Sequence, residues 1–507
     1  MNPGYDLGSV TRSFLAALLA ALLALSLAGT ANAFGKQDLG IPMDDGATLA
    51  ATLYTPDGSA PVTGWPAAIL LHGIGGTRAG MSELAEGYLA PQGYAVLTFD
   101  ARGHGASGGL FSADGPREMQ DVKTLHAWLA ARPGIDRAHI GAIGISLGGG
   151  AVWRSAVEGV PWAAIVPLIT WTDLYEALIP HDLAKSGAVL QFLQAVSPAR
   201  SAPTLNAIRE DVIQSRNAPA LRAFSAERSS RPQLNGLSIP TFMLQGRRDF
   251  AFDLREALSA FSLLRGPKRL YIGNLGHAPA SNPAAERPYY FGQIRLWLDR
   301  FLKGMPNGID TRPPIELAPD PWTGKTVNYR STPPTSTLSL SFPGKQTITP
   351  SGKVVRTVKL PRRALETFGA PTVQISAASA TGWPHVVAVL SALAPGGEEI
   401  VVSAGGTKTD GLTSRGRRGR RISIRLISQA TTIPSGSRLR LTLASSSTAQ
   451  NTRNLLYLDI PFGSSARLTL SGATVKLPVM QKRISVNRSI APSSHPLHNS
   501  EERKGYE

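Results

Sequence analysis

The sequence contains no cysteine among its 507 residues. This absence excludes disulfide bonds, thiol nucleophiles, cysteine-based zinc sites and lipid anchors on cysteine. Charged residues are also scarce, at 17 % of the chain, whereas average soluble domains hold about 25 %. The hydrophobic fraction of 42 % is sufficient for a core, so a chain that is disordered throughout is excluded as well.

Long apolar runs are absent except at the start of the chain. Residues 14–28 carry no charge, follow Arg12, and precede the small residues of Ala31-Asn32-Ala33. A membrane span needs about 20 apolar residues, and this order of segments is typical of a secretory signal. We therefore predict a signal peptide over 1–33, cleaved after Ala33, and an exported (periplasmic or secreted) mature protein. A retained N-terminal anchor is the alternative.

Negative charge is lacking in the last two fifths of the chain. The formal net charge is +17, and residues 305–507 hold 26 Lys and Arg against 11 Asp and Glu. The densest basic run covers residues 415–421. We interpret this part as a solvated basic surface, with weak contact to polyanions as the sharper expectation. No recognition motif accompanies the charge, so specific nucleic-acid binding is not expected.

Apolar runs of strand length alternate with helical patterns over 34–304, which predicts a mostly parallel sheet covered on both faces. The predicted strands are 49–54, 67–71, 95–99, 140–145, 163–168, 241–244 and 269–272. The predicted helices are 82–90, 120–131, 147–157, 254–264 and 291–303.

Four further segments interrupt or follow this pattern. Residues 173–235 read as helical and predict a cap inserted over the sheet, and residues 305–334 are rich in Pro and Gly and predict a linker. Short β-branched runs over 335–483 predict an all-β sandwich or jelly roll. The polar residues 484–507 predict a disordered tail. The last of the predicted β-domain strands are 438–444, 454–460 and 467–470.

The motif Gly-x-Ser-x-Gly occurs at residues 144–148, with Ser146 at its centre. It follows the predicted strand 140–145 and opens the predicted helix 147–157, which is the setting of a nucleophile elbow. Ser146 is therefore the predicted nucleophile.

A nucleophilic serine needs a base, and the base needs an orienting acid, in the chain order serine, acid, histidine. Asp249 follows the predicted strand 241–244, and His277 follows the next strand. Loops at the carboxyl ends of parallel strands meet at one edge of the sheet. We predict Asp249 as acid and His277 as base, with Asp253 as the alternative acid.

The oxyanion hole is expected from two backbone amides, Leu147 after the serine and Ile74 in the glycine-rich loop 72–76. Serine hydrolysis of this kind needs no metal and no organic cofactor, and none is predicted. Asp173 and Tyr175, at the start of the cap, are the candidates for substrate binding by their position.

These motifs resemble the X-Pro dipeptidyl-peptidase-like α/β-hydrolases, which include peptidase family S15 and the CocE/NonD esterases. The resemblance rests on the stretch 99–108, Trp128-Leu129 followed by Pro133, the elbow at Ser146, the cap start at residues 173–175 and the trailing β domain. It covers roughly residues 40–480 and implies the α/β-hydrolase fold, a C-terminal jelly roll and hydrolysis of esters or amides through an acyl-enzyme. The family often has a Tyr in the early loop, whereas residues 72–76 contain none, which favours an esterase.

Three functions remain open on the sequence. The leading one is an exported serine hydrolase of small acyl esters or amides, and the second is an X-Pro dipeptidyl-peptidase acting on short peptides. The third belongs to another class, a non-catalytic envelope-binding protein on a hydrolase scaffold. Carbohydrate binding by Trp322 or Trp383 of the C-terminal part is a weaker possibility, because packing explains both side chains.

Overall fold

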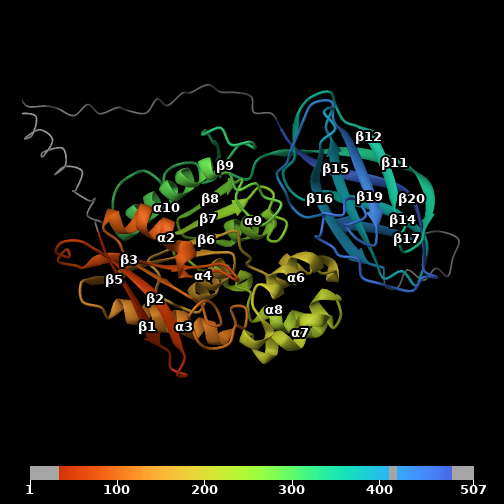
Figure 1. Cartoon of the computed structure of the whole chain (residues 1–507). Coiled ribbons are helices and arrows are strands. Elements are labelled where there is room, and N and C mark those ends of the chain that lie inside the picture. Colours follow the sequence, from red (N-terminus) through yellow and green to blue (C-terminus); the bar gives the residue numbers. More distant parts are fainter. Residues whose placement is uncertain (1–33, 410–419, 482–507) are drawn as a thin grey trace, which may run out of the picture.

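The computed structural model describes residues 34–409 and 420–481, which form a sheet-and-helix domain and a second domain made of strands (Figure 1). The predicted signal peptide, residues 415–419 of the basic run and the predicted tail lie outside the described residues. Within the described ranges, no helix is both long and apolar enough to cross a membrane.

A ten-stranded sheet is the centre of the first domain, in the order β1-β2-β4-β3-β5-β6-β7-β8-β9-β10. The strands from β4 to β9 run parallel, while β1, β2 and β10 pair antiparallel with their neighbours. Their bounds are β1 Phe34–Pro42, β2 Thr48–Pro56, β3 Trp65–Leu71, β4 Ala95–Phe99, β5 Ile135–Ile145, β6 Ala164–Leu168, β7 Thr241–Gly246, β8 Lys268–Gly273, β9 Ile315–Leu317 and β10 Val327–Tyr329.

All seven strands predicted for this domain are confirmed, and three more were missed. The strands β9 and β10 lie inside the predicted linker 305–334, which therefore extends the sheet instead of only joining two domains. Each has three residues between prolines and glycines, which is too short for a period-two pattern to be read from the sequence.

Helices cover both faces of the sheet. Successive strand residues point to opposite faces, and both sets are buried, so each face needs a covering layer. In β3, Ile69 joins the core beneath one set of helices, and its neighbour Leu70 joins the core of the opposite face. The first face carries α3 (Pro116–Ala130), α4 (Leu147–Val157) and α9 (Leu254–Leu263), and the other carries α10 (Arg287–Leu302). The predicted helix 82–90 is helical throughout but irregular, because α2 (Ser82–Leu84) continues as a π-helical segment, Ala85–Leu89, and a 3₁₀ turn, Ala90–Gln92.

Four short helices are inserted between β6 and β7, at the carboxyl edge of the sheet (Figure 1). They are α5 (Leu174–Leu178), α6 (Ser186–Gln194), α7 (Pro203–Ile213) and α8 (Ala218–Ala226). Their apolar residues pack on one another and on the loops that follow the parallel strands. We refer to residues 173–235 as the cap.

The second domain has two four-stranded antiparallel sheets with one apolar core between them. Their orders are β11-β20-β14-β17 and β12-β19-β15-β16. The bounds are β11 Thr335–Ile348, β12 Val354–Lys359, β14 Thr372–Thr381, β15 His385–Leu393, β16 Glu399–Lys408, β17 Arg420–Arg425, β19 Arg438–Ala444 and β20 Arg467–Met480, and a small pair joins β13 (Leu365–Glu366) to β18 (Thr432–Ile433).

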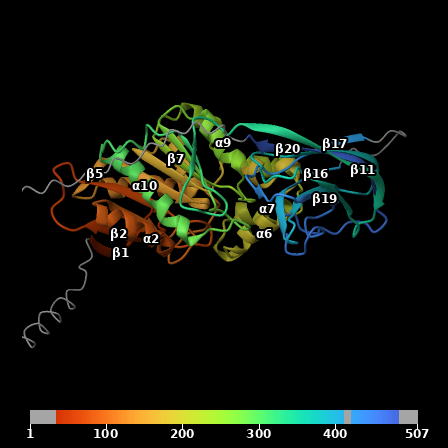
Figure 2. The same cartoon turned by 90° about the horizontal axis from the view of Figure 1, so that it is seen from above.

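The strand predicted over 454–460 is wrong, because these residues form an irregular segment. Their polar groups bond to the cap rather than to a sheet: Gly187 N donates to the Leu456 carbonyl at 3.1 Å, and Leu458 N donates to Ser186 Oγ at 2.9 Å. Figure 2 shows the second domain at one end of the molecule, beside α9 and the cap. This contact brings residues of the second domain close to the carboxyl edge of the sheet.

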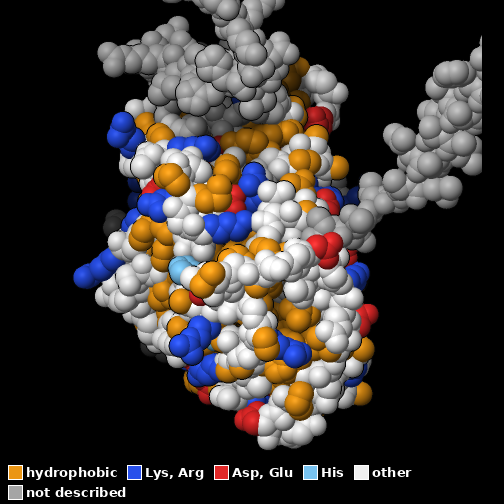
Figure 3. Space-filling model, turned by 90° about the vertical axis from the view of Figure 1, so that its left-hand side faces the viewer, with side chains coloured by type: hydrophobic (Ala, Val, Ile, Leu, Met, Phe, Trp, Pro, Cys, Tyr) orange, Lys and Arg blue, Asp and Glu red, His pale blue; other side chains and the backbone are white. Residues whose placement is uncertain are grey.

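Figure 3 shows the end of the molecule formed by the first domain, which carries no single basic patch. There, Lys and Arg side chains form several small groups with Asp and Glu between them. Trp383 is buried and donates from its indole to the His385 carbonyl at 2.7 Å. Trp322 packs against Tyr289. Both tryptophans are therefore part of the packing.

Candidate active site

Ser146 lies at the sharp turn between β5 and α4. Its backbone angles are φ 55° and ψ −114°, a strained combination that few residues other than glycine adopt. The turn is closed by two tight approaches: a Cβ on Gly144 would lie 2.0 Å from the Gly148 carbonyl oxygen, and one on Gly148 would lie 2.2 Å from the Leu71 carbonyl oxygen. Only glycine fits both places, which explains the motif and presents the serine side chain at the edge of the sheet.

The three residues predicted to act together lie together. Ser146 Oγ is 2.8 Å from His277 Nε2, and His277 Nδ1 is 2.9 Å from Asp249 Oδ2. Asp249 is fully buried, whereas the His277 side chain keeps 19 % of its exposure. This chain of hydrogen bonds allows His277 to accept the serine proton while its other nitrogen remains bonded to a carboxylate.

The Asp249 carboxylate is held by backbone donors on both oxygens. Oδ1 accepts from Ala251 N and Phe252 N, both at 3.0 Å, and Oδ2 also accepts from His277 N at 3.2 Å. Hydrogen bonds of this kind stabilise the ionised form of a buried carboxyl group. The carboxylate is thus fixed in position and oriented toward the histidine.

Asp253, the alternative acid, has a different task. Its Oδ1 accepts from Arg255 N at 2.9 Å at the start of α9, and its Oδ2 accepts from Ser428 N of the second domain at 2.9 Å. The side chain caps the helix and joins the two domains. The structure therefore pairs His277 with Asp249 and not with Asp253.

Two backbone amides near Ser146 are available to a ligand. Neither Ile74 N nor Leu147 N donates to an acceptor in the part of the chain that the structure describes. The loop that carries Ile74 is held by His72, whose Nδ1 bonds to the Gly73 carbonyl at 2.7 Å and whose Nε2 accepts from Ala101 N at 2.9 Å. Burial lowers the pKa of His72, which keeps the ring neutral and able to accept at Nε2.

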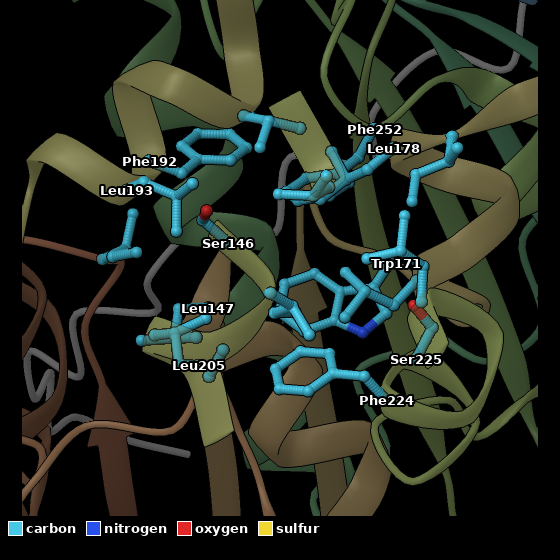
Figure 4. Close-up of a pocket in the computed structure, with 18 of the residues that line it drawn as sticks. Ser146, Leu147, Trp171, Leu178, Phe192, Leu193, Leu205, Phe224, Ser225 and Phe252 are labelled. Atoms are coloured by element: carbon cyan, nitrogen blue, oxygen red, sulfur yellow. The ribbon is translucent and has the colours of Figure 1, made fainter. Parts of the chain in front are cut away.

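An apolar cavity of about 100 Å³ opens beside the Ser146 hydroxyl. Figure 4 shows this hydroxyl pointing toward Phe192 and Leu193, with Trp171 and Phe224 on the far side of the cavity. Among its lining residues only Ser146 and Ser225 are polar, and none is charged. The four cap helices, the elbow and neighbouring loops supply the rest, which are Ile74, Phe111, Ala113, Leu147, Leu174, Leu178, Ile179, Val189, Leu205, Ile208, Val212, Leu221 and Phe252.

The two residues predicted to bind substrate do not line this cavity. Asp173 caps α5 by accepting from Glu176 N at 3.0 Å. The Tyr175 hydroxyl donates to Asp182 at 2.6 Å, and the Arg222 guanidinium lies 4.0 Å from the centre of its ring. Asp173 and Tyr175 therefore bond within the cap, and the cavity beside Ser146 does not bring them to a substrate.

Two residues that support the site were missed from the sequence. Lys185 of the cap is buried, and its Nζ donates to the Ala251 carbonyl at 2.9 Å. Gln429 of the second domain donates from Nε2 to the Asp249 carbonyl at 2.8 Å. Both hold the loop of the acid from a distance in sequence that no local pattern spans.

No group of three or more His, Asp or Glu side chains within 34–409 and 420–481 is arranged to hold a metal ion. The charged side chains near the site hold the neighbouring loops in place through ion pairs and hydrogen bonds. Asp100 accepts from Arg78 and from Ala106 N, and Arg102 binds Asp121 and Asp45. These contacts fix the stretch 99–108 beside the loop of His72.

The first domain is similar to known proteins in its sequence. Residues 45–279 match the family model described as X-Pro dipeptidyl-peptidase (S15 family). The chain is 33 % identical to the cocaine esterase of Rhodococcus sp. (strain MB1 Bresler) over 141 residues, and 24 % identical to a putative Xaa-Pro dipeptidyl-peptidase of Streptomyces avermitilis over 265 residues. These matches cover 27 % and 48 % of this chain, and 24 % and 39 % of the two relatives. The chain thus spans less than half the length of either relative.

The likeness in structure extends over both domains. A CocE/NonD family hydrolase from Staphylococcus aureus superposes with a TM-score of 0.67 at 14 % identity, covering 88 % of this chain and 94 % of that one. This agreement confirms the expected fold, an α/β-hydrolase domain followed by a β domain. Together with the family match over residues 45–279 and the two relatives, it supports the resemblance to the X-Pro dipeptidyl-peptidase-like α/β-hydrolases of the S15 and CocE/NonD group.

Proposed function

We propose that this protein is a serine hydrolase that cleaves esters of apolar carboxylic acids through an acyl-enzyme on Ser146. The observation that carries the proposal is the continuous hydrogen-bonded chain from Ser146 through His277 to Asp249, which opens on an apolar cavity. A scaffold used only for binding has no need of this arrangement, since a strained serine and a buried carboxylate both cost stability.

The reaction follows from the distances. His277 Nε2 takes the proton from Ser146 Oγ as the Oγ–carbon bond to the ester carbonyl forms. The amides of Ile74 and Leu147 are the donors for the resulting oxyanion. The bond between the carbonyl carbon and the alcohol oxygen then breaks, and the proton on Nε2 passes to the departing alcohol. Water then attacks the acyl carbonyl carbon while His277 takes its proton. The bond to Ser146 Oγ breaks, the proton returns to Oγ, and the acid leaves.

The acyl group is the part of the substrate that suits the cavity. Its walls offer dispersion contacts and burial, worth about 25 cal/mol per Å² of apolar surface removed from water. They offer no carboxylate for a free α-amino group, which a dipeptidyl-peptidase must recognise. We therefore favour an esterase over the X-Pro dipeptidyl-peptidase that the family model names.

Paired rates test this proposal. Protein beginning at Phe34 is assayed on p-nitrophenyl acetate, butyrate and hexanoate and on Ala-Pro-p-nitroanilide, with Ser146→Ala as control. We expect ester turnover that rises from acetate to hexanoate, no anilide turnover and no activity in S146A. Anilide turnover that needs a free N-terminus would instead support the dipeptidyl-peptidase. Residual activity in S146A would remove Ser146 from the mechanism.

We also propose that the protein is exported. The order of segments in residues 1–33, Arg12 before the apolar run and Ala31-Asn32-Ala33 after it, supports this proposal. N-terminal sequencing of the protein from fractionated cells tests this. Phe34 as the first residue outside the cytoplasm is the expected result, and an intact Met1 in the cytoplasmic fraction would contradict it.

A further inference from the structure

A second and larger hollow lies next to Ala278, the residue after His277, where the cap meets the second domain. It has a volume of about 560 Å³, in the range of ligand sites in proteins, roughly 300–1,000 Å³. Its floor includes Phe250, Ala278 and Pro279, which directly follow the acid and the base in sequence. Its walls are one face of α6 and the irregular segment 450–458. We refer to it as the interdomain groove.

The helix α6 separates the interdomain groove from the apolar cavity. Val189, Phe192 and Leu193 line the cavity, whereas Gln191 and Gln194 line the groove. Residues three and four apart share a face of a helix, so α6 presents one face to each space. Ser146 lines the cavity, and Ala278, the residue after His277, lines the groove, so the two spaces lie next to the two reacting side chains.

Proton transfer from His277 determines which part of the ester enters the groove. His277 Nε2 must give its proton to the alcohol oxygen, so the alcohol departs on the histidine side. Ala278 and Pro279, which directly follow His277, line the groove, whereas Phe192, whose ring centre is 5.4 Å from that of His277, lines the cavity. The acyl chain thus has the apolar cavity, and the leaving alcohol has the groove.

The lining of the groove differs from that of the cavity in its polar groups. It includes five carboxamide side chains, those of Gln191, Gln194, Gln450, Asn451 and Asn454. The amides of Gln191 and Gln194 are exposed and make no hydrogen bond to any side chain or backbone group between 34 and 409 or between 420 and 481. A carboxamide both donates and accepts, which matches the hydroxyl groups of a neutral ligand.

The lining of the groove contains one acidic and one basic side chain, and the acidic side chain is already paired. Its one acid, Glu399, pairs with Arg440 at 3.2 Å, and its one base is Arg453 at the rim. Leu190, Leu455 and Val401 add apolar surface between the amides. A strongly charged alcohol finds no matching cluster here, whereas a sugar or polyol presents both hydroxyls and apolar C–H faces.

We propose that the interdomain groove binds the leaving alcohol and selects esters of sugars or polyols with apolar acids. This inference rests on the proposed esterase function. It assigns the second domain a part in substrate recognition, because segment 450–458 supplies one wall.

Two esters of the same acid separate the inference from the proposed function. Methyl hexanoate and 6-O-hexanoylglucose form the same acyl-enzyme, so deacylation is identical and kcat/KM reports the acylation step, in which the alcohol is still bound. Hydrolysis of methyl hexanoate that depends on Ser146 tests the esterase itself. The ratio of the two kcat/KM values tests the groove.

The variant Gln191→Leu/Gln194→Leu removes two carboxamides and keeps the helix. We expect kcat/KM on hexanoylglucose to fall about tenfold, the effect of roughly two neutral hydrogen bonds, while the value on methyl hexanoate stays within about twofold. Gln37→Leu is the matched control, since Gln37 is exposed on β1, outside the groove. It should leave both values unchanged.

A second variant tests the space rather than the hydrogen bonds. Ala188→Trp places a large ring on the groove side of α6 and should raise KM for hexanoylglucose and not for methyl hexanoate. Equal losses on both esters in both variants would overturn the inference, because they would mean that α6 acts only through the catalytic centre. A wild-type enzyme that prefers methyl hexanoate to hexanoylglucose would overturn it as well, even with full Ser146-dependent activity.

Discussion

Gln429, a residue of the second domain, donates a hydrogen bond from its Nε2 to the backbone carbonyl of Asp249 at 2.8 Å. The same contact continues on both sides, because Ala430 N donates to the Arg247 carbonyl at 2.8 Å and Leu254 N donates to the Ser428 carbonyl at 3.1 Å. The loop that carries the predicted acid is thus held by the second domain. Removing that support should alter catalysis without touching the reacting groups.

We predict that Gln429→Ala lowers kcat on p-nitrophenyl hexanoate by roughly three- to tenfold, about the effect of one neutral hydrogen bond. KM should change little, since Gln429 does not line the acyl cavity. Gln346→Ala is the control, because this glutamine lies on β11 and its side chain donates to the Lys353 carbonyl at 3.2 Å, away from the loop of Asp249. Steady-state kinetics beside thermal unfolding checks the prediction, and a rise in KM at constant kcat would argue against a positioning role.

A second prediction separates the two candidate acids. Asp249→Asn puts an amide where His277 Nδ1 now finds a carboxylate, which disfavours the tautomer that can accept the serine proton. By analogy with other serine hydrolases we expect kcat to fall by about 10³–10⁴. Asp253→Asn keeps one accepting oxygen and so loses only one of the two contacts, to Arg255 N or to Ser428 N, so kcat should stay within a few fold. The two variants are compared on one ester at one pH, and the reverse order of effects would assign the acid to Asp253.

The acyl cavity gives a third prediction. Phe224 lies on its far side from Phe192 (Figure 4), so Phe224→Ala should lengthen the space that an acyl chain can use. We expect kcat/KM to rise several fold for p-nitrophenyl decanoate relative to butyrate.

The control for Phe224 is Phe261→Ala, which removes the same ring from α9, outside the cavity. It should leave the ratio of decanoate to butyrate unchanged while costing some stability. If both variants shift the ratio equally, acyl chains do not extend to Phe224.

The sequence was sufficient to predict Ser146, Asp249 and His277 as the residues that meet, because each prediction rests on a local constraint. Gly144 and Gly148 are required by backbone contacts within a few residues of Ser146 and by the neighbouring strand. Asp249 and His277 follow buried strands whose apolar runs are plain in the sequence, and the parallel sheet brings the ends of those strands together. Chain order and strand ends therefore predicted which side chains meet.

The cap and the contact between domains were not predictable in the same way. Asp173 and Tyr175 were expected at the substrate and instead bond within the cap, since their direction depends on how four short helices pack. Gln429 and Asp249 are 180 residues apart and meet through a contact between folded domains. Segment 454–460 has a strand-like composition, yet its backbone bonds to α6. Each outcome depends on tertiary contacts that local propensity does not encode.

A last prediction concerns a buried carboxyl group near the nucleophile helix. Asp114 has φ 60°, is buried, and its Oδ2 has no hydrogen-bond partner among the described residues. Burial raises the pKa of this carboxyl well above its usual range, the charge of Glu118 raises it further, and Arg228 lowers it only in part. At a pH between the usual Asp range and this raised pKa, the native state therefore holds a proton on Asp114 that the unfolded chain has released.

Because the native state binds more protons than the unfolded one, the stability contributed by Asp114 falls as the pH rises from the usual Asp range toward its raised pKa. Asp114→Asn has no such titration, and asparagine tolerates a positive φ. We expect D114N to unfold at a higher temperature than the wild type at pH 8, with the difference shrinking toward pH 4. The control is Asp57→Asn, an exposed residue after β2, which should show no such trend. Thermal unfolding followed by circular dichroism at several pH values measures both, and a D114N protein that is less stable at pH 8 than at pH 4, relative to wild type, would show that Asp114 is charged and paired in the native state.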